Sequence, residues 1–175
     1  AEGNCERSFT SGDSDRGYGF ASFGVTQGKW YWEVKIPTVA RANTGIGDLN
    51  GIAEFTGVIY DQTPSKGFIV NYNGQIEENG TATSYANSGD PTSGSTGTGD
   101  VTTQISDQSH LNTGEPMFPF CLDASTSGQS KFQWNFGNAP FSISSGNSDG
   151  LYGNFEYAVP SGYYALCTKR LAVFG

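Results

Sequence analysis

The chain has 175 residues, of which 25 are glycine, and it carries 17 acidic against 9 basic residues, for a formal charge of −8. A surface this acidic repels phosphate backbones and argues against nucleic acid as a partner, although the charge also simply favours solubility. No apolar run approaches the ~20 residues that span a bilayer, so we predict no membrane insertion. Abundant Gly, Ser, Thr and Asn with no periodic helical run predict an all-β fold of short strands and many turns.

The predicted strands run, in chain order, over 18–25, 28–36, 44–51, 58–60, 67–72, 116–123, 131–137 and 163–168. The second strand is the most regular, because large apolar residues occupy every second position and one face would carry both Trp30 and Trp32. Pro37 is expected to end it, since proline cannot donate to a central ladder. Asn73-Gly74 predicts a type I′ hairpin turn.

Two strand faces supply the expected core. Trp30 and Trp32 would share one face, and Phe132, Trp134 and Phe136 would share another. Each buried tryptophan would remove on the order of 200 Å² from water. We therefore expect these five aromatic side chains to anchor a single antiparallel β-sandwich.

The domain organisation is expected to be simple. Residues 1–175 would form one domain, a segment of a longer protein, and no signal peptide is visible at its start. Residues 87–100 are low in complexity and polar, which predicts a flexible surface loop, because strand patterns resume after them.

The order of these segments resembles the SPRY family. Gly28–Val34 matches the most recognisable strand of that family, Gly45–Gly47 is similar to its next small-residue strand, and Gly67–Gly74 is similar to its Gly/aromatic segment. Residues 135–141 and 159–171 resemble the closing pattern of SPRY-like modules in bacteriophage virion proteins, particularly those of marine and cyanobacterial phages.

The resemblance implies a concanavalin-like jelly-roll β-sandwich and a place on the virion, assembled in the host cytoplasm. It implies a structural or adhesion role in a tail fibre, a tail or a capsid decoration, with other virion proteins and further copies of the chain as partners. Residues 102–115 depart from the family, because they lack its aromatic-Asn-Gly hairpin, which is either shortened or rebuilt here. No binding residues are carried over from eukaryotic members.

An enzyme is not expected. Retaining glucanases on this type of fold place their carboxylates at alternate strand positions, about 5–5.5 Å apart, and the pattern Glu-x-Asp-x-x-Glu is absent. Glu77 and Glu78 are adjacent and would point to opposite faces. His110 is the only histidine and lies in a polar stretch, which is more typical of a solvated side chain than of a catalytic triad.

No cofactor is predicted, and calcium is the one metal that the sequence leaves open. Asp13 with Asp15, and Asp48 with Asn50, offer pairs of oxygen ligands at close spacing. The second pair also fits an Asx turn, which is the favoured interpretation.

The three cysteines do not have metal-ligand spacing. Cys121 and Cys167 lie in apolar runs and are expected to be buried thiols, whereas a Cys5–Cys167 disulfide is the less favoured alternative.

Ligand contacts are expected in the loops over 48–66, 79–100 and 142–156. Because exposed aromatic and polar side chains in such loops commonly carry binding, the candidates are Asp48, Asn50, Tyr60, Asp61, Tyr85 and Tyr152. Each tyrosine could instead pack a strand end. The expected function is a noncatalytic virion module that binds host-surface glycan or virion protein, with a free carbohydrate-binding lectin or, less favoured, a glycoside hydrolase as alternatives.

Overall fold

The computed structural model describes residues 5–9, 17–38, 42–48, 67–70, 75–78, 81–84, 114–123 and 129–174. Over these ranges regular structure is almost entirely β-strand, and the pairing is mostly antiparallel. The all-β prediction is therefore confirmed.

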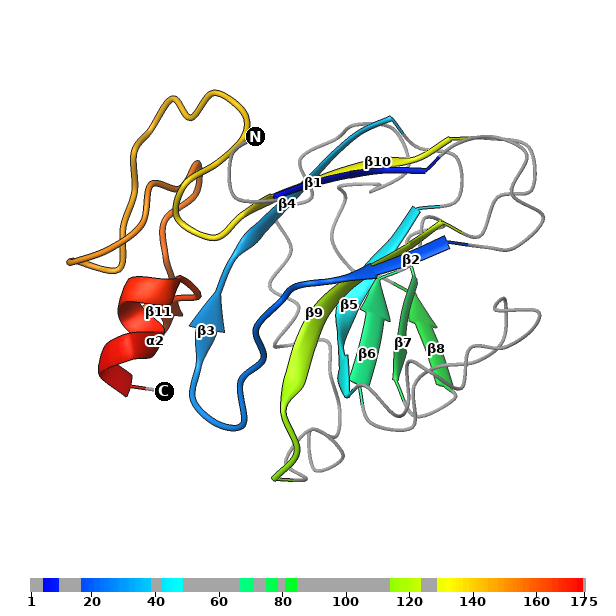
Figure 1. The fold of residues 1–175 in the computed structure, drawn as a ribbon, viewed down its shortest axis with the longest axis horizontal. Coiled ribbons are helices and arrows are strands. Elements are labelled where there is room, and N and C mark those ends of the chain that lie inside the picture. The colour runs from blue at the N-terminus through cyan, green and yellow to red at the C-terminus, as the bar shows by residue number, and fades with distance from the viewer. Residues whose placement is uncertain are drawn as a thin grey trace.

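The strands of the described residues form three sheets (Figure 1). The largest has the order β2 (Gly17–Phe20), β9 (Met117–Asp123), β5 (Ala42–Asp48), β6 (Gly67–Val70), β7 (Gln75–Glu78) and β8 (Thr81–Ser84). A three-stranded sheet has the order β1 (Glu6–Ser8), β10 (Lys131–Asn135) and β4 (Glu33–Thr38). The smallest pairs β11 (Tyr164–Ala165) with β3 (Trp30–Tyr31), and this pair is parallel.

The central strand β9 is buried on both faces. Phe120 and Leu122 pack with Ile69 in one apolar cluster, whereas Cys121, which points to the opposite face, belongs to a second cluster. This explains why the sequence of β9 is continuously apolar instead of alternating.

The second cluster joins the three-stranded sheet to the six-stranded sheet. It contains Phe132 and Trp134 from β10, together with Phe9, Ala42 and Cys121, all of which are buried. Trp32, Val34, Ile36 and Phe136 pack against it while partly buried. Four of the five predicted core aromatics therefore meet between the two sheets.

The fifth, Trp30, lies elsewhere, because the predicted strand 28–36 is divided. The chain leaves β3 at Tyr31, passes Trp32 and enters β4 at Glu33, so this stretch of sequence contributes one strand to each of two sheets. Trp30 packs against Tyr164, with ring centroids 6.2 Å apart, and its Nε1 donates to the carbonyl of Gln27 at 2.7 Å. The prediction that Trp30 and Trp32 anchor the same core face was wrong.

Several other boundaries differ from prediction. β4 continues to Thr38 because it is the outer strand of its sheet, where Pro37 removes no hydrogen bond from a central ladder. β6 and β7 pair antiparallel, as expected of a hairpin, although the turn at 73–74 lies outside the described residues. Strands β1 and β8 and the helix α2 (Thr168–Phe174) were not predicted. The strand expected over 58–60 and the loop over 87–100 also lie outside the described residues.

Candidate functional site

The segment from 136 to 174, called here the C-terminal layer, follows β10 and covers one end of the molecule. It contains little regular structure beyond an isolated bridge between Asn147 and Phe155, the strand β11 and the helix α2. Figure 1 shows it in gold to red at the left-hand end, beside β3. Backbone hydrogen bonds order parts of this layer, and side-chain hydrogen bonds add to them.

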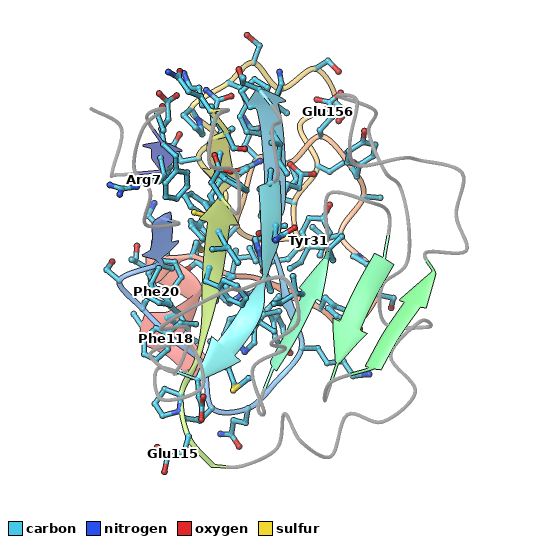
Figure 2. The ribbon with its side chains drawn as sticks, turned by 90° about the vertical axis from the view of Figure 1, so that its right-hand side faces the viewer. Arg7, Phe20, Tyr31, Glu115, Phe118 and Glu156 are labelled. Carbon is cyan, nitrogen blue, oxygen red and sulfur yellow. The ribbon has the colours of Figure 1, made fainter. Side chains whose placement is uncertain are left out.

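Glu33, at the start of β4, fixes the layer to the sheet. Its Oε1 accepts from the hydroxyl of Tyr31 at 3.0 Å and the backbone amide of Tyr157 at 2.9 Å. Its Oε2 accepts from Nδ2 of Asn135 at 2.8 Å and the backbone amide of Glu156 at 3.2 Å. Figure 2 shows Tyr31 and Glu156 on the same side of β3 and β4. Burial and the neighbouring carboxylate of Glu33 raise the pKa of Tyr31 above its ordinary value, so this phenol stays protonated as a donor.

Asn135 makes a second connection at the end of β10. It is fully buried, and its Nδ2 also donates to the carbonyl of Asn154 at 2.8 Å. Its Oδ1 accepts from the amide of Gly137 at 2.8 Å. Gly137 and Gly153 both have positive φ, and their backbones approach so closely that a Cβ on Gly137 would lie 3.0 Å from the Cα of Gly153. Glycine is required at this crossing.

Asp149 organises the other half of the layer. Its side chain is fully shielded from solvent. Oδ1 accepts from the amides of Leu151 at 3.0 Å and Tyr152 at 2.7 Å, and Oδ2 accepts from the amide of Ala165 at 2.9 Å and Nε of Arg170 at 2.8 Å. Burial alone would raise the pKa of Asp149, but the bonds from Arg170 and the three amides outweigh it and hold the pKa well below its usual range.

The guanidinium of Arg170 lies between two aromatic rings. Its Cζ is 5.0 Å from the ring centre of Tyr152 and 4.8 Å from that of Tyr164, which in turn contacts Trp30. We call these four residues the Arg170 stack. Arg170 on α2 is also paired with Asp149, so its contacts connect α2 to the 149–152 turn and to Tyr164 on β11. Because β11 pairs with β3, the same contacts connect α2 to β3.

The C-terminal layer also carries the exposed apolar surface of the described chain. The large hydrophobic side chains that the described residues expose are Leu151 at 65%, Val173 at 61%, Tyr164 at 37% and Tyr157 at 36%, and all four lie in this layer. Exposed single residues are common, but a concentration in one layer indicates a contact surface.

This layer differs from the remaining chain in charge. Residues 136–175 contain two acids, Asp149 and Glu156, and two bases, Lys169 and Arg170, so the whole formal charge of −8 resides on residues 1–135. Asp149 is neutralised by Arg170, and Glu156 accepts from the amide of Ser144 at 2.7 Å.

The two carboxylates that bind the layer, Glu33 on β4 and Asp149 within it, serve structure. Glu33 and Asp149 each accept four hydrogen bonds, which occupy the lone pairs that a general base or a metal ligand would use. Among the residues that the structure describes, no group of three or more His, Cys, Asp or Glu side chains could hold a metal ion. In the same part of the chain, no helix is long and apolar enough to cross a membrane.

The structure places two of the six candidate ligand residues. Asp48 is 3% exposed at the end of β5, and Tyr152 is half-buried against Arg170. Asn50, Tyr60, Asp61 and Tyr85 lie outside the described residues.

None of the three cysteines forms a disulfide. Cys121 is buried, as predicted, whereas Cys167, which was also expected to be buried, is half-buried. Cys5 is half-buried too, and it does not form the alternative disulfide with Cys167.

Sequence reasoning did not find Arg170, Asp149 or the exposed Leu151 and Val173. The run Ser148-Asp149-Gly150 signals a turn, and an Asp at its centre can accept from the backbone amides two and three residues later. Nothing in the local pattern shows that its second oxygen meets a guanidinium in α2.

Comparison with known proteins adds no assignment: no protein-family model, curated protein or solved structure matches this chain.

Proposed function

We propose that this chain is a noncatalytic structural or adhesion module of a bacteriophage virion, built on a SPRY-like β-sandwich, which acts through contacts of its surface with other molecules. The observation that supports this best is the C-terminal layer, where exposed apolar side chains gather on a firmly bonded scaffold. A rigid scaffold with an apolar contact surface suits assembly and binding.

The bonding of two acidic side chains that the structure describes, Glu33 and Asp149, supports a noncatalytic role. A general acid needs a proton to donate, and a general base needs an accessible lone pair. Glu33 and Asp149 meet neither need, because four donors surround each carboxylate.

The partner on the particle is a neighbouring virion protein or a host-surface glycan. Among the tyrosines, Tyr152 suits a glycan less than expected, because its ring already packs against Arg170. The ring of Tyr164 packs against Arg170 as well, but 37% of this residue remains exposed. The free lectin is the alternative, and it predicts saturable sugar binding that the substitution Tyr60→Ala or Tyr85→Ala abolishes.

Localising the chain on intact particles tests the proposal. An antibody against the purified chain, with immunogold or cryo-electron microscopy, should label a fibre, a tail or the capsid lattice. Particles without label, while the same antibody detects the chain in the lysate, would reject the virion assignment. A glycan array probed with the same protein then separates adhesion from a purely structural role.

A further inference from the structure

The turn that contains Asp149 also contains a chemically reactive pair of residues. Asp149-Gly150 is the one Asp-Gly pair in the sequence. Glycine has no side chain to shield its backbone nitrogen, so in an unfolded chain this nitrogen can reach the carboxyl carbon of the preceding aspartate. Gly150 is exposed, and a Cβ placed on it would meet no neighbouring atom within 4 Å. Steric crowding around Gly150 therefore does not protect this pair.

The reaction that such a pair undergoes needs no enzyme and no reactant besides water. The nitrogen of Gly150 attacks Cγ of the protonated Asp149 carboxyl group, a C–N bond forms, and the carboxyl hydroxyl leaves as water together with the amide proton. The product is a cyclic succinimide. Water then opens the ring at either carbonyl, and opening at the backbone carbonyl gives isoaspartate, in which the main chain runs through Cγ. One water leaves and one returns, so the modification is an isomerisation.

The fold opposes the first step of this reaction. The carboxylate of Asp149 accepts from three backbone amides and from Nε of Arg170, and turning its Cγ toward the nitrogen of Gly150 would break these bonds. The nitrogen of Gly150 itself donates to Oγ of Ser148 at 3.2 Å. The four bonds to the carboxylate also hold the pKa of Asp149 well below its usual range, so the protonated form that can release water is rare in the folded state.

We propose that Asp149 is a site of spontaneous isoaspartate formation, which the folded C-terminal layer suppresses and opening of this layer permits. The modification adds one methylene group to the main chain after Asp149 and leaves the carboxylate attached directly to Cα. Such a carboxylate cannot reach the four donors that lie 2.7–3.0 Å from the native oxygens. Isomerisation therefore removes the ion pair with Arg170 and makes opening of the layer irreversible.

Incubation of the purified chain at about pH 5, folded in buffer and unfolded in guanidinium chloride, is the direct test. At this pH a small fraction of unfolded carboxyl groups with the usual pKa of 3.8 is protonated. Trypsin releases the peptide 132–169, which contains one Asp and no Asn-Gly pair, and electron-transfer fragmentation distinguishes its isoaspartate form. We expect isoaspartate at 149 to form at least about tenfold more slowly in the folded chain, because the layer must open first. Equal rates, or an unfolded chain that forms no isoaspartate over weeks, would overturn the proposal.

Substitutions test whether the hydrogen bonds provide the protection. Arg170→Met removes one of the four donors and should raise the rate in the folded chain at least about fivefold. Lys169→Met is the matched control, because it removes an exposed neighbouring cation and should leave the rate unchanged. Gly150→Ala adds a side chain beside the attacking nitrogen and should slow the reaction even in the unfolded chain, where folding of the variant has no influence. Far-ultraviolet circular dichroism verifies that the first two variants fold, and a folded Arg170→Met chain that reacts at the wild-type rate would contradict the proposal.

Refolding tests irreversibility separately. Isomerised chain that is transferred from denaturant into buffer should show fast amide hydrogen exchange throughout 136–174, whereas unmodified chain treated in the same way should recover slow exchange there. Slow exchange in the layer of the isomerised chain would reject the claim that isoaspartate keeps the layer open. All of these outcomes are independent of the virion assignment, because they concern only the chemistry of the chain itself.

Discussion

Replacing Asp149 by alanine should destabilise the protein strongly at neutral pH. The change removes the acceptor for three backbone amides and leaves the guanidinium of Arg170 without its carboxylate. Breaking a buried ion pair from one side costs about 3–5 kcal/mol in other proteins. Because this pair lies in a layer at one end of the molecule, we expect a loss near the lower value, about 3 kcal/mol.

The pH dependence gives this prediction a second, independent readout. The folded protein holds the pKa of Asp149 well below its usual value of 3.8, so this carboxyl stays charged in the folded state at pH values where the unfolded state binds a proton. Its contribution is therefore complete above the unfolded pKa and is lost as the pH falls toward the folded one. The difference in unfolding free energy between wild type and Asp149→Ala should shrink between about pH 5 and pH 3.

Urea unfolding followed by tryptophan fluorescence at several pH values measures both effects. A double-mutant cycle with Arg170→Met isolates the pair, since the two substitutions should not add if their energy is shared. A loss below about 1 kcal/mol at pH 7, the range of exposed ion pairs, would refute the reasoning. So would a difference that is the same at low and neutral pH.

Three further predictions concern other parts of the structure. Gly153→Ala should lower the free energy of unfolding by at least about 2 kcal/mol, because the φ of Gly153 is +99° and a Cβ would collide with the ring of Phe155. Gly150→Ala should lower it by about 1 kcal/mol, because the φ of Gly150 is +89° but the space around it is open. Equal losses for the two variants in thermal unfolding would contradict this prediction. Glu33→Ala should loosen the C-terminal layer and raise the rate of amide hydrogen exchange there, because the carboxylate of Glu33 bonds this layer to β4. Glu6→Ala, which removes an exposed carboxylate on β1, should leave exchange in the layer unchanged. Unchanged exchange in both variants would disprove the role of Glu33. Cys121 should resist thiol reagents in the folded state, since burial raises its pKa to about 12. The two half-buried cysteines, Cys5 and Cys167, should react first. Mass spectrometry after timed labelling measures the three rates, and equal rates would contradict the prediction.

Local sequence patterns predicted those strands that can be identified without knowing which strands they pair with. β9 and β10 were expected over almost their whole length, because dense apolar residues at strand positions suffice to identify buried strands. β1 was missed because Glu6, Arg7 and Ser8 are all exposed and offer no apolar alternation. The helix α2 was missed because seven residues are too few for a helical period to show, although Leu171 and Ala172 favour helix.

The candidate site depends on contacts that no local pattern contains. Asp149 meets Arg170 because β11 returns the chain to β3, a parallel pairing between distant segments. The same pairing moves Trp30 away from the core and toward Tyr164. Alternation in the sequence correctly indicated a strand at Trp30, but it could not indicate which sheet this strand joins.

The pairing of β3 with β11 has a consequence for synthesis. The strand Trp30–Tyr31 leaves the ribosome long before its partner Tyr164–Ala165 exists, so its edge stays open while most of the chain is made. An open edge beside large aromatic residues can pair with another nascent chain. Closure by the last strand therefore protects the molecule late in folding, and chains interrupted before β11 should be prone to aggregate even though both larger sheets are already encoded.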